Sequence, residues 1–232
     1  MMFTPGEDTD HEPKRRLWKA FCSRMGVMVD AVPLFDTDGL TVRTSRHRTR
    51  GHVMLRRSPA MEGLVIAEVD KLVADFAEGC RRYDGLIYMM LKKRGDDQVP
   101  LYIGKAETLG KSANLSANIV RLSTDRSKFA RWGDGYAYHI GDLSAAACPG
   151  HAKPAPAKYM RWAGALFANA PSERPDLRES VFFWCKAWRK GEIGPFSEFG
   201  PASLTALEYL LIGLAGTVYP ADLLNSEGKN RV

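Results

Sequence analysis

The sequence predicts a mixed α/β (α+β) fold in which helices flank one small sheet. The predicted elements follow the order helix, hairpin, helix, strand, helix, strand, helix, which is a plan built around a small sheet. A nearly uninterrupted apolar run from Gly85 to Leu91 predicts a strand that is covered on both faces. The chain has 232 residues, of which 45% are apolar, so it is long enough to bury a sizeable core.

An N-terminal extension precedes the hairpin. Residues 1 to 13 are polar and acidic, and we expect a disordered tail there. Residues 14 to 83 form the extension proper, which begins with apolar residues at helical spacing and continues over residues 31 to 57 as short strands and turns. An apolar stripe from Leu64 to Phe76 predicts a longer helix over residues 64 to 80, with Gly79 as its cap.

The hairpin covers residues 85 to 104, and the remaining elements follow it. Residues 94 to 97 have the composition of a turn, Pro100 is expected to open the second strand, and Gly104 is expected to close it. Downstream, the pattern predicts helices over 114–122, 158–169 and 204–215, strands over 135–140 and 181–188, and a proline-rich loop over 145–157.

Composition narrows the class of protein. A net charge of +6 and a pI near 9.2 favour a polyanionic partner. The chain has neither a recognisable signal peptide nor an apolar stretch of 18 residues, so we expect no membrane partner. Widely spaced cysteines disfavour a disulfide scaffold and a zinc site, and they fit a reducing cytoplasm. These cysteines are Cys22, Cys80, Cys148 and Cys185.

Two short runs in the hairpin, Leu86-Ile87-Tyr88 and Tyr102-Ile103-Gly104-Lys105, resemble the core of the GIY-YIG endonuclease family. The second run matches the family name letter for letter, whereas Leu86 stands where the family usually has glycine. The resemblance implies a three-stranded antiparallel sheet flanked by helices, over residues 84 to 232, with an insertion around 145–180. It also implies DNA as partner, Mg²⁺ (or Mn²⁺) as cofactor, and hydrolysis of phosphodiester bonds as activity.

The two tyrosines are the first candidates for catalysis. Tyr88 stands on the first tyrosine of the family and is the leading candidate for the base that activates water. An unperturbed phenol has a pKa of about 10, so ionising it at pH 7 costs about 4 kcal/mol, and Lys105 could supply a cation that lowers this cost. Tyr102 would bind a water molecule or a phosphate oxygen. The alternative is that both tyrosines only fill the strands, with satisfied hydroxyls.

Glu208 is the candidate metal ligand. On a helix its neighbours include Leu204, Leu211 and Ile212, and a carboxylate among them is costly unless it is paired or metal-bound. One glutamate can suffice for Mg²⁺, which retains several waters. The run Leu-Glu-x-x-Leu-Ile resembles the C-terminal helix of the family, and Asn225 resembles its downstream asparagine, which we expect to support the helix end and to contact DNA. The alternative is a capping box, Thr205-x-x-Glu208, in which Glu208 only satisfies a helix-end amide.

The phosphate clamp is assigned by resemblance to an arginine on the helix after the second tyrosine. Asn118 stands at the family's arginine position, so Arg121, nearly one turn later, and Arg131 are the candidates. Lys111 and Lys128 could share this task, and His139 could join proton transfer or contact phosphate.

A basic run over residues 43 to 57 is the candidate DNA contact. No acidic residue interrupts it, and arginine suits phosphate oxygens, although a solvated β-ribbon face is the alternative. The arginines of this run are Arg43, Arg46, Arg48, Arg50, Arg56 and Arg57.

The most concrete hypothesis is therefore a divalent-metal-dependent DNA endonuclease, acting in restriction, phage defence or a mobile element. A double-strand cut would need a homodimer or two successive nicks. One alternative is a non-catalytic nucleic-acid-binding protein that retains the nuclease fold. Another is a small α/β protein that binds a protein partner through the aromatic segment 182–188.

Overall fold

A four-stranded antiparallel sheet organises the chain, in the order β1-β8-β6-β7. The computed structural model describes residues 11–47, 51–110, 112–117, 119–120, 138–152 and 154–227, with the side chains of 138–142 left undescribed. The hairpin consists of β6 (Tyr83–Arg94) and β7 (Asp97–Glu107), which pair along their whole length. Its turn includes Gly95, whose φ of +57° is a conformation that favours glycine. The predicted turn over residues 94 to 97 is confirmed.

The sheet has four strands because the N-terminal extension adds one to the expected three. β1 (Val32–Pro33) pairs antiparallel with the start of β8 (Phe182–Arg189). Pro33 lacks an N–H and so suits an outermost strand. The expectation of three strands was therefore wrong, because β1 is a fourth strand of the sheet. The other three, β7, β6 and β8, lie side by side and antiparallel.

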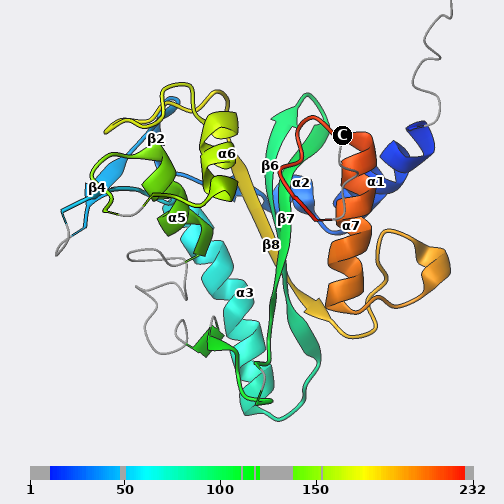
Figure 1. Ribbon diagram of the computed structural model, residues 1–232. Coiled ribbons are helices and arrows are strands. Elements are labelled where there is room, and N and C mark those ends of the chain that lie inside the picture. Colours follow the sequence, from blue (N-terminus) through cyan, green and yellow to red (C-terminus); the bar gives the residue numbers. More distant parts are fainter. Residues whose placement is uncertain are drawn as a thin grey trace, which may run out of the picture.

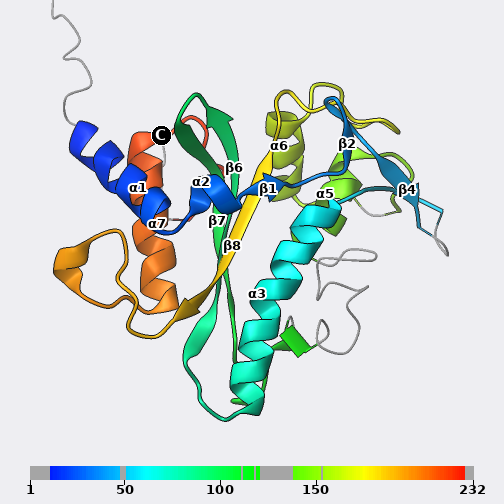
Figure 2. The ribbon, with the colours of Figure 1, turned by 180° about the vertical axis from the view of Figure 1, so that it is seen from behind.

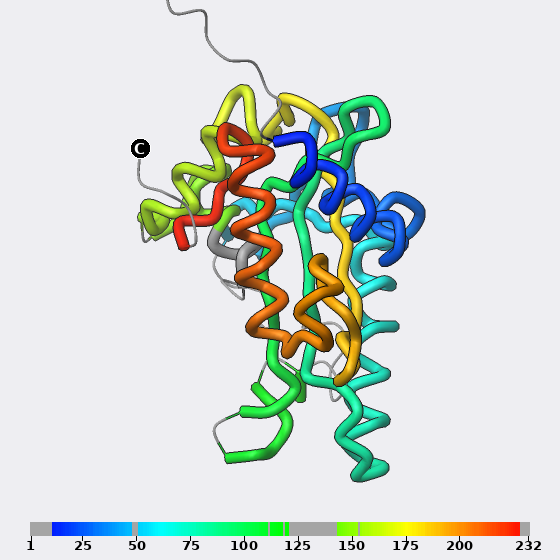
Figure 3. The backbone as a smooth tube through the Cα atoms, turned by 90° about the vertical axis from the view of Figure 1, so that its right-hand side faces the viewer, coloured from blue at the N-terminus to red at the C-terminus, as the bar shows by residue number. Residues whose placement is uncertain are grey.

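Helices cover both faces of the sheet (Figures 1 and 2). One face carries α3 (Pro59–Ala77), α5 (Tyr138–Ala147) and α6 (Ala157–Leu166). The other carries α1 (Glu12–Arg24), α2 (Val27–Asp30) and α7 (Leu204–Val218), and Figure 3 shows α7 running along the sheet. No described helix is both long and apolar enough to cross a membrane.

This layering explains the apolar run in β6. Alternate side chains of a strand point to opposite faces, and here both faces are covered. Leu86, Tyr88 and Met90 join the core beneath α3 and α6, whereas Ile87 and Met89 join the core beneath α7. The predicted two-faced burial of this strand is confirmed.

Short strands form a separate β-region at one end of the molecule. They are β2 (Thr37–Asp38), β3 (Thr41–Val42), β4 (Thr44–Arg46) and β5 (Val53–Leu55), and they make two small antiparallel pairs. A 3₁₀ turn, η3 (Ser197–Phe199), precedes α7.

Local signals set the helix ends. The α3 helix begins earlier than predicted because the Ser58 hydroxyl accepts a 2.9 Å hydrogen bond from the Met61 N–H, and Pro59 follows at the first helical position. The helix ends at Ala77. Gly79 follows with a φ of +72°, the left-handed conformation in which a glycine commonly terminates a helix.

Several predicted boundaries were wrong. β7 continues past Gly104 to Glu107, and Pro100 lies inside it, beside a shift in the register with β6. Residues 138–140, expected in a strand, begin α5, and the loop expected from residue 145 starts after Ala147. Residues 12 and 13, expected in the tail, belong to α1, while residues 1–10 lie outside the described residues. The helix expected over 114–122 is described only in part, with residues 117, 119 and 120 helical.

Asp75 joins the end of α3 to the start of β6. Its carboxylate is 2% exposed and accepts 2.7 Å hydrogen bonds from both the backbone N–H and the Nε of Arg82, and a third from the Tyr83 N–H. Burial alone would raise the pKa of Asp75, but the hydrogen bonds from Arg82 and Tyr83 hold it below its ordinary value of 3.8.

The charged form of Asp75 should therefore stabilise the fold above pH 3.8, and this stabilisation should be lost as the pH falls through the lower folded-state pKa. Urea unfolding of Asp75→Asn at pH 7 should give a lower free energy of unfolding than the parent protein, and the difference should shrink below pH 3.8. Asp96→Asn, in the exposed β6–β7 turn, is the control and should show no such gap. A gap for Asp75→Asn that is independent of pH would contradict the assignment.

Candidate active site at the edge of strand β7

The outer edge of β7 is satisfied by residues from α7 and from the chain that follows it. The Leu224 N–H donates a 2.8 Å hydrogen bond to the Leu101 carbonyl. Asn225 accepts from the Ile103 N–H at 3.0 Å and donates to the Ile103 carbonyl at 2.9 Å. Glu208 accepts a hydrogen bond from the Lys105 N–H. Three successive outward-facing positions of the strand thus receive partners, as an outermost strand requires.

Asn225 was expected to contact DNA, and the structure corrects this expectation. The residue is only 4% exposed, and its amide oxygen and nitrogen are both hydrogen-bonded to Ile103. A buried amide in this position holds the strand edge and presents no surface to a nucleic acid.

The capping-box alternative for Glu208 is wrong. The N-cap of α7 is Ser203, whose hydroxyl accepts a 3.3 Å hydrogen bond from the Ala206 N–H. Glu208 lies beyond the first turn, and its carboxylate reaches Lys105 on β7 instead of an amide at the helix end. The helix therefore begins without help from Glu208.

The surroundings of Glu208 act on its charge in opposite directions. Burial raises the pKa of the carboxyl, the Lys105 ammonium and the Lys105 N–H lower it, and the nearby carboxylates of Glu227 and Glu107 raise it again; the net shift is upward. A cation at this carboxylate would favour its ionised form.

Tyr102 approaches the same edge from the opposite face of the sheet. Its side chain is 9% exposed, and the Lys158 ammonium donates a 3.2 Å hydrogen bond to its hydroxyl oxygen. Burial raises the pKa of Tyr102 to about 12, with the Glu208 and Glu227 carboxylates adding to the shift. Ionising this phenol at pH 7 would cost about 7 kcal/mol, so it is a neutral hydroxyl in the free protein.

Tyr88 lies deeper than Tyr102. Its ring sits between Tyr102 and Phe183, at centroid distances of 6.3 and 6.0 Å, and the residue is 2% exposed. Its hydroxyl end lies over Gly104, where a Cβ atom would be only 2.5 Å from the hydroxyl oxygen. Gly104 thus provides the space that the Tyr88 ring occupies, and Tyr88 is much less accessible than the edge itself.

The Lys105 ammonium is engaged with a carboxylate of its own strand. It forms a hydrogen-bonded ion pair with Glu107, two residues along β7, while its backbone N–H goes to Glu208. The lysine therefore lies between two acidic groups, and its positive charge balances both.

Sequence reasoning missed Lys158 and Glu227. Lys158 begins α6, inside the segment 145–180 that was expected to be an insertion, and its ammonium lies 4.6 Å from the Tyr102 ring centroid and 5.1 Å from that of Trp162. Glu227 follows Asn225 in the chain and affects the pKa of both Tyr102 and Glu208. Neither residue belongs to a motif, so nothing in the sequence marked them.

Several predicted site residues are not placed at this edge. Those outside the described residues are Arg48, Arg50, Lys111, Arg121, Lys128 and Arg131. The backbone of His139 is in the first turn of α5, where a strand was expected, and its side chain lies outside the described part.

The basic run lies away from the β7 edge. Figures 1 and 2 place the β2–β5 region at one end of the molecule, with α5 and α6 between it and the sheet. Arg43 lies 3.7 Å from the Asp36 carboxylate, and Arg46 lies 3.0 Å from that of Glu173. Carboxylates from other parts of the chain therefore lie beside arginines of this run, although the run itself contains no acidic residue.

The aromatic segment 182–188 is not a partner-binding surface. It forms β8 in the interior of the sheet, where Trp184 and Trp188 are at most 1% exposed. Burial on both faces accounts for its composition.

The donor set at the edge fits a hard divalent cation. Among the described residues, no group of three or more His, Cys, Asp or Glu side chains is arranged to hold a metal ion. Glu208 still offers a half-buried carboxylate with the Glu227 carboxylate within electrostatic reach. Mg²⁺ is commonly held by one or two carboxylates and keeps several waters, so these oxygen donors suit Mg²⁺ or Mn²⁺.

Comparisons of this chain with models of protein families, with curated proteins and with solved structures find no match. The likeness to the GIY-YIG nucleases is therefore a resemblance in the two strand motifs and the helix motif around Glu208.

Replacing Gly104 with alanine should destabilise the protein by about 1–3 kcal/mol, because the new methyl group would overlap the Tyr88 ring. The matched control is Gly164→Ala in α6, where a Cβ meets nothing within 4 Å and removing a helix glycine should be neutral or stabilising by up to about 1 kcal/mol. Chemical unfolding measures both changes. Equal stability of the two variants would show that Tyr88 does not require the space above position 104.

Proposed function

We propose that this protein is a divalent-metal-dependent DNA endonuclease that hydrolyses phosphodiester bonds. One observation carries the proposal: Glu208 of α7 approaches Tyr102 and Lys105 of β7 at the β7 edge. The two resembling strand motifs predict these residue types for that chemistry. The net charge of +6 supports a polyanionic substrate.

Glu208 would hold Mg²⁺ or Mn²⁺, with Glu227 as an additional carboxylate within electrostatic reach. When bound, the metal would neutralise charge that develops on the phosphate and on the leaving oxygen. Lys105 holds the Glu208 carboxylate in place through its backbone N–H and favours the ionised form of the carboxylate through its ammonium.

Tyr102 would act as a hydrogen-bond donor. Because the Lys158 ammonium donates to the Tyr102 oxygen, the phenolic proton is directed elsewhere, toward a phosphate oxygen or a water molecule. Lys158 also brings a positive charge to the phenol, on the side of the sheet opposite Glu208. The role of Tyr88 as base stays a prediction, as does the arginine clamp by Arg121 or Arg131.

A non-catalytic nucleic-acid-binding protein is the second candidate. Tyr88 is 2% exposed and the Lys105 ammonium is paired with Glu107, and both features favour a site that binds without hydrolysing. Retention of DNA in shift assays, without cleavage in Mg²⁺ or Mn²⁺, would identify this function.

Glu208→Gln should abolish Mg²⁺-dependent nicking of supercoiled plasmid, with a loss of about 100-fold or more. Glutamine can still accept the hydrogen bond from Lys105 but carries no charge for a cation. Agarose-gel kinetics with and without Mg²⁺ measure the effect, and the thermal unfolding midpoint of Glu208→Gln should stay close to that of the parent protein.

Glu68→Gln is the matched control, because Glu68 accepts a 2.8 Å hydrogen bond from the Ala187 N–H on the other side of the sheet. It should nick plasmid at the parent rate. Full activity in Glu208→Gln, or an equal loss in both variants, would show that Glu208 only hydrogen-bonds the edge of β7 and has no specific role in hydrolysis.

Lys158→Met should lower the nicking rate about tenfold, because the Tyr102 oxygen loses its ammonium donor and the phosphate loses a nearby cation. Lys158→Arg keeps the charge and should recover most of the rate. Single-turnover rates at saturating DNA separate this effect from weaker binding. A Lys158→Arg variant as slow as Lys158→Met would indicate that packing against Trp162 is the only role of Lys158.

A further inference from the structure

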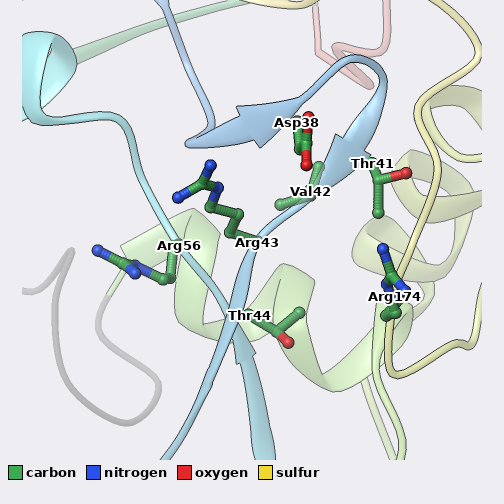
Figure 4. Close-up of a pocket in the computed structure, with 7 residues that line it drawn as sticks. All are labelled: Asp38, Thr41, Val42, Arg43, Thr44, Arg56 and Arg174. Carbon is green, nitrogen blue, oxygen red and sulfur yellow. The ribbon is translucent and has the colours of Figure 1, made fainter.

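A second site lies in the β2–β5 region, away from the β7 edge. A pocket of about 340 Å³ is lined there by three arginines, one carboxylate and the side chains between them (Figure 4). The lining residues are Asp38, Thr41, Val42, Arg43, Thr44, Arg56 and Arg174.

Backbone hydrogen bonds hold the three arginines in place. The Arg56 N–H donates to the Arg43 carbonyl at 2.9 Å, and the Arg43 N–H donates to the Asp36 carbonyl at 2.8 Å. The Arg174 segment, far away in the sequence, docks against the same strands, because the Val42 N–H donates to the Pro175 carbonyl at 2.9 Å. The pocket is therefore pre-organised by the fold, whatever the conformations of the arginine side chains.

The arginine side chains keep their hydrogen-bond donors available. Arg43 and Arg56 face the Asp36 carboxylate at 3.7 and 3.4 Å, distances of ion pairs without close hydrogen bonds. Within the described part of the chain, the Arg174 guanidinium makes no hydrogen bond and no ion pair. All three residues are exposed, and each guanidinium carries five N–H donors and no acceptor.

We propose that this pocket binds the phosphodiester backbone of a DNA strand and anchors it away from the β7 edge; the choice of DNA rests on the proposed function. Arginine is suited to phosphate oxygens because its fork donates two parallel hydrogen bonds. Figure 4 shows the Arg43 and Arg56 side chains extending to one side of β3, while Arg174 lies on the other side, near Thr41. Such an open arrangement fits a strand that passes across the pocket better than one enclosed small anion.

Asp38 gives the proposal a test of opposite sign. Its carboxylate lines the pocket and would repel a phosphate, so its removal should strengthen the binding that loss of an arginine weakens. Because each of these substitutions also changes the net charge of the protein, an arginine removed elsewhere on the surface is needed as a control.

Binding of a fluorescein-labelled DNA duplex, followed by anisotropy in EDTA, tests the site without cleavage. Arg174→Ala should raise the Kd about fivefold and reduce the slope of log Kd against log salt by about one between about 50 and 200 mM KCl. Asp38→Asn should lower the Kd. Arg16→Ala, an exposed arginine of α1 on the other side of the sheet, is the control and should leave the Kd nearly unchanged.

Equal losses in Arg174→Ala and Arg16→Ala, or no binding by the parent protein, would overturn the inference. A thermal shift with inorganic phosphate that disappears in Arg174→Ala, without any change in DNA affinity, would also overturn it by making free phosphate the ligand. The expected binding result without Mg²⁺-dependent nicking would sustain the DNA contact and reject the hydrolytic proposal.

Discussion

The outer edge of β7 determines where the remaining parts of the candidate site lie. An outermost strand leaves every second backbone N–H and carbonyl without a strand partner, and burial of such groups is costly. Here Asn225, Leu224 and Glu208 satisfy successive positions of that edge. The same contacts fix the segment of Leu224 and Asn225 and one face of α7 against the strand that carries Tyr102 and Lys105. A requirement of the backbone thus brings a carboxylate, a phenol and an ammonium group to one place.

The segment that carries Asn225 is itself held from two directions. Lys92, on β6, is 6% exposed and pairs with the carboxylate of Asp222 at 2.8 Å. Arg161, on α6, donates a 2.9 Å hydrogen bond to the Leu224 carbonyl. Because α6 also supplies Lys158, the helix that positions this segment is the helix that contacts Tyr102. The helix α6 therefore both stabilises this segment and places a positive charge beside Tyr102.

The sequence was most informative where local chemistry and packing agree. The hairpin was predictable because its turn has suitable residues and β6 is apolar on both faces, and α7 was predictable because most of its residues are apolar. The pairing of β1 with β8 depends on backbone groups at the edge of β8 that need hydrogen-bond partners, and no local sequence pattern indicates such an edge. Lys158 escaped notice because a surface lysine at a helix start is common, and only the tertiary contact with Tyr102 distinguishes it. The acids that face the basic run were missed for the same reason, since Glu173 is remote from Arg46 in sequence.

The outermost strands also limit how two copies of the chain can associate. On the other side of the sheet, Pro33 has no N–H to offer, its carbonyl accepts a hydrogen bond from the Ser58 hydroxyl, and Glu68 occupies the Ala187 N–H of β8. At the opposite margin, the amide of Asn225 fills the central position of β7. A continuous sheet shared between two protomers would have to displace these contacts first. A homodimer of this chain would consequently join through its helices or loops and not through a shared sheet.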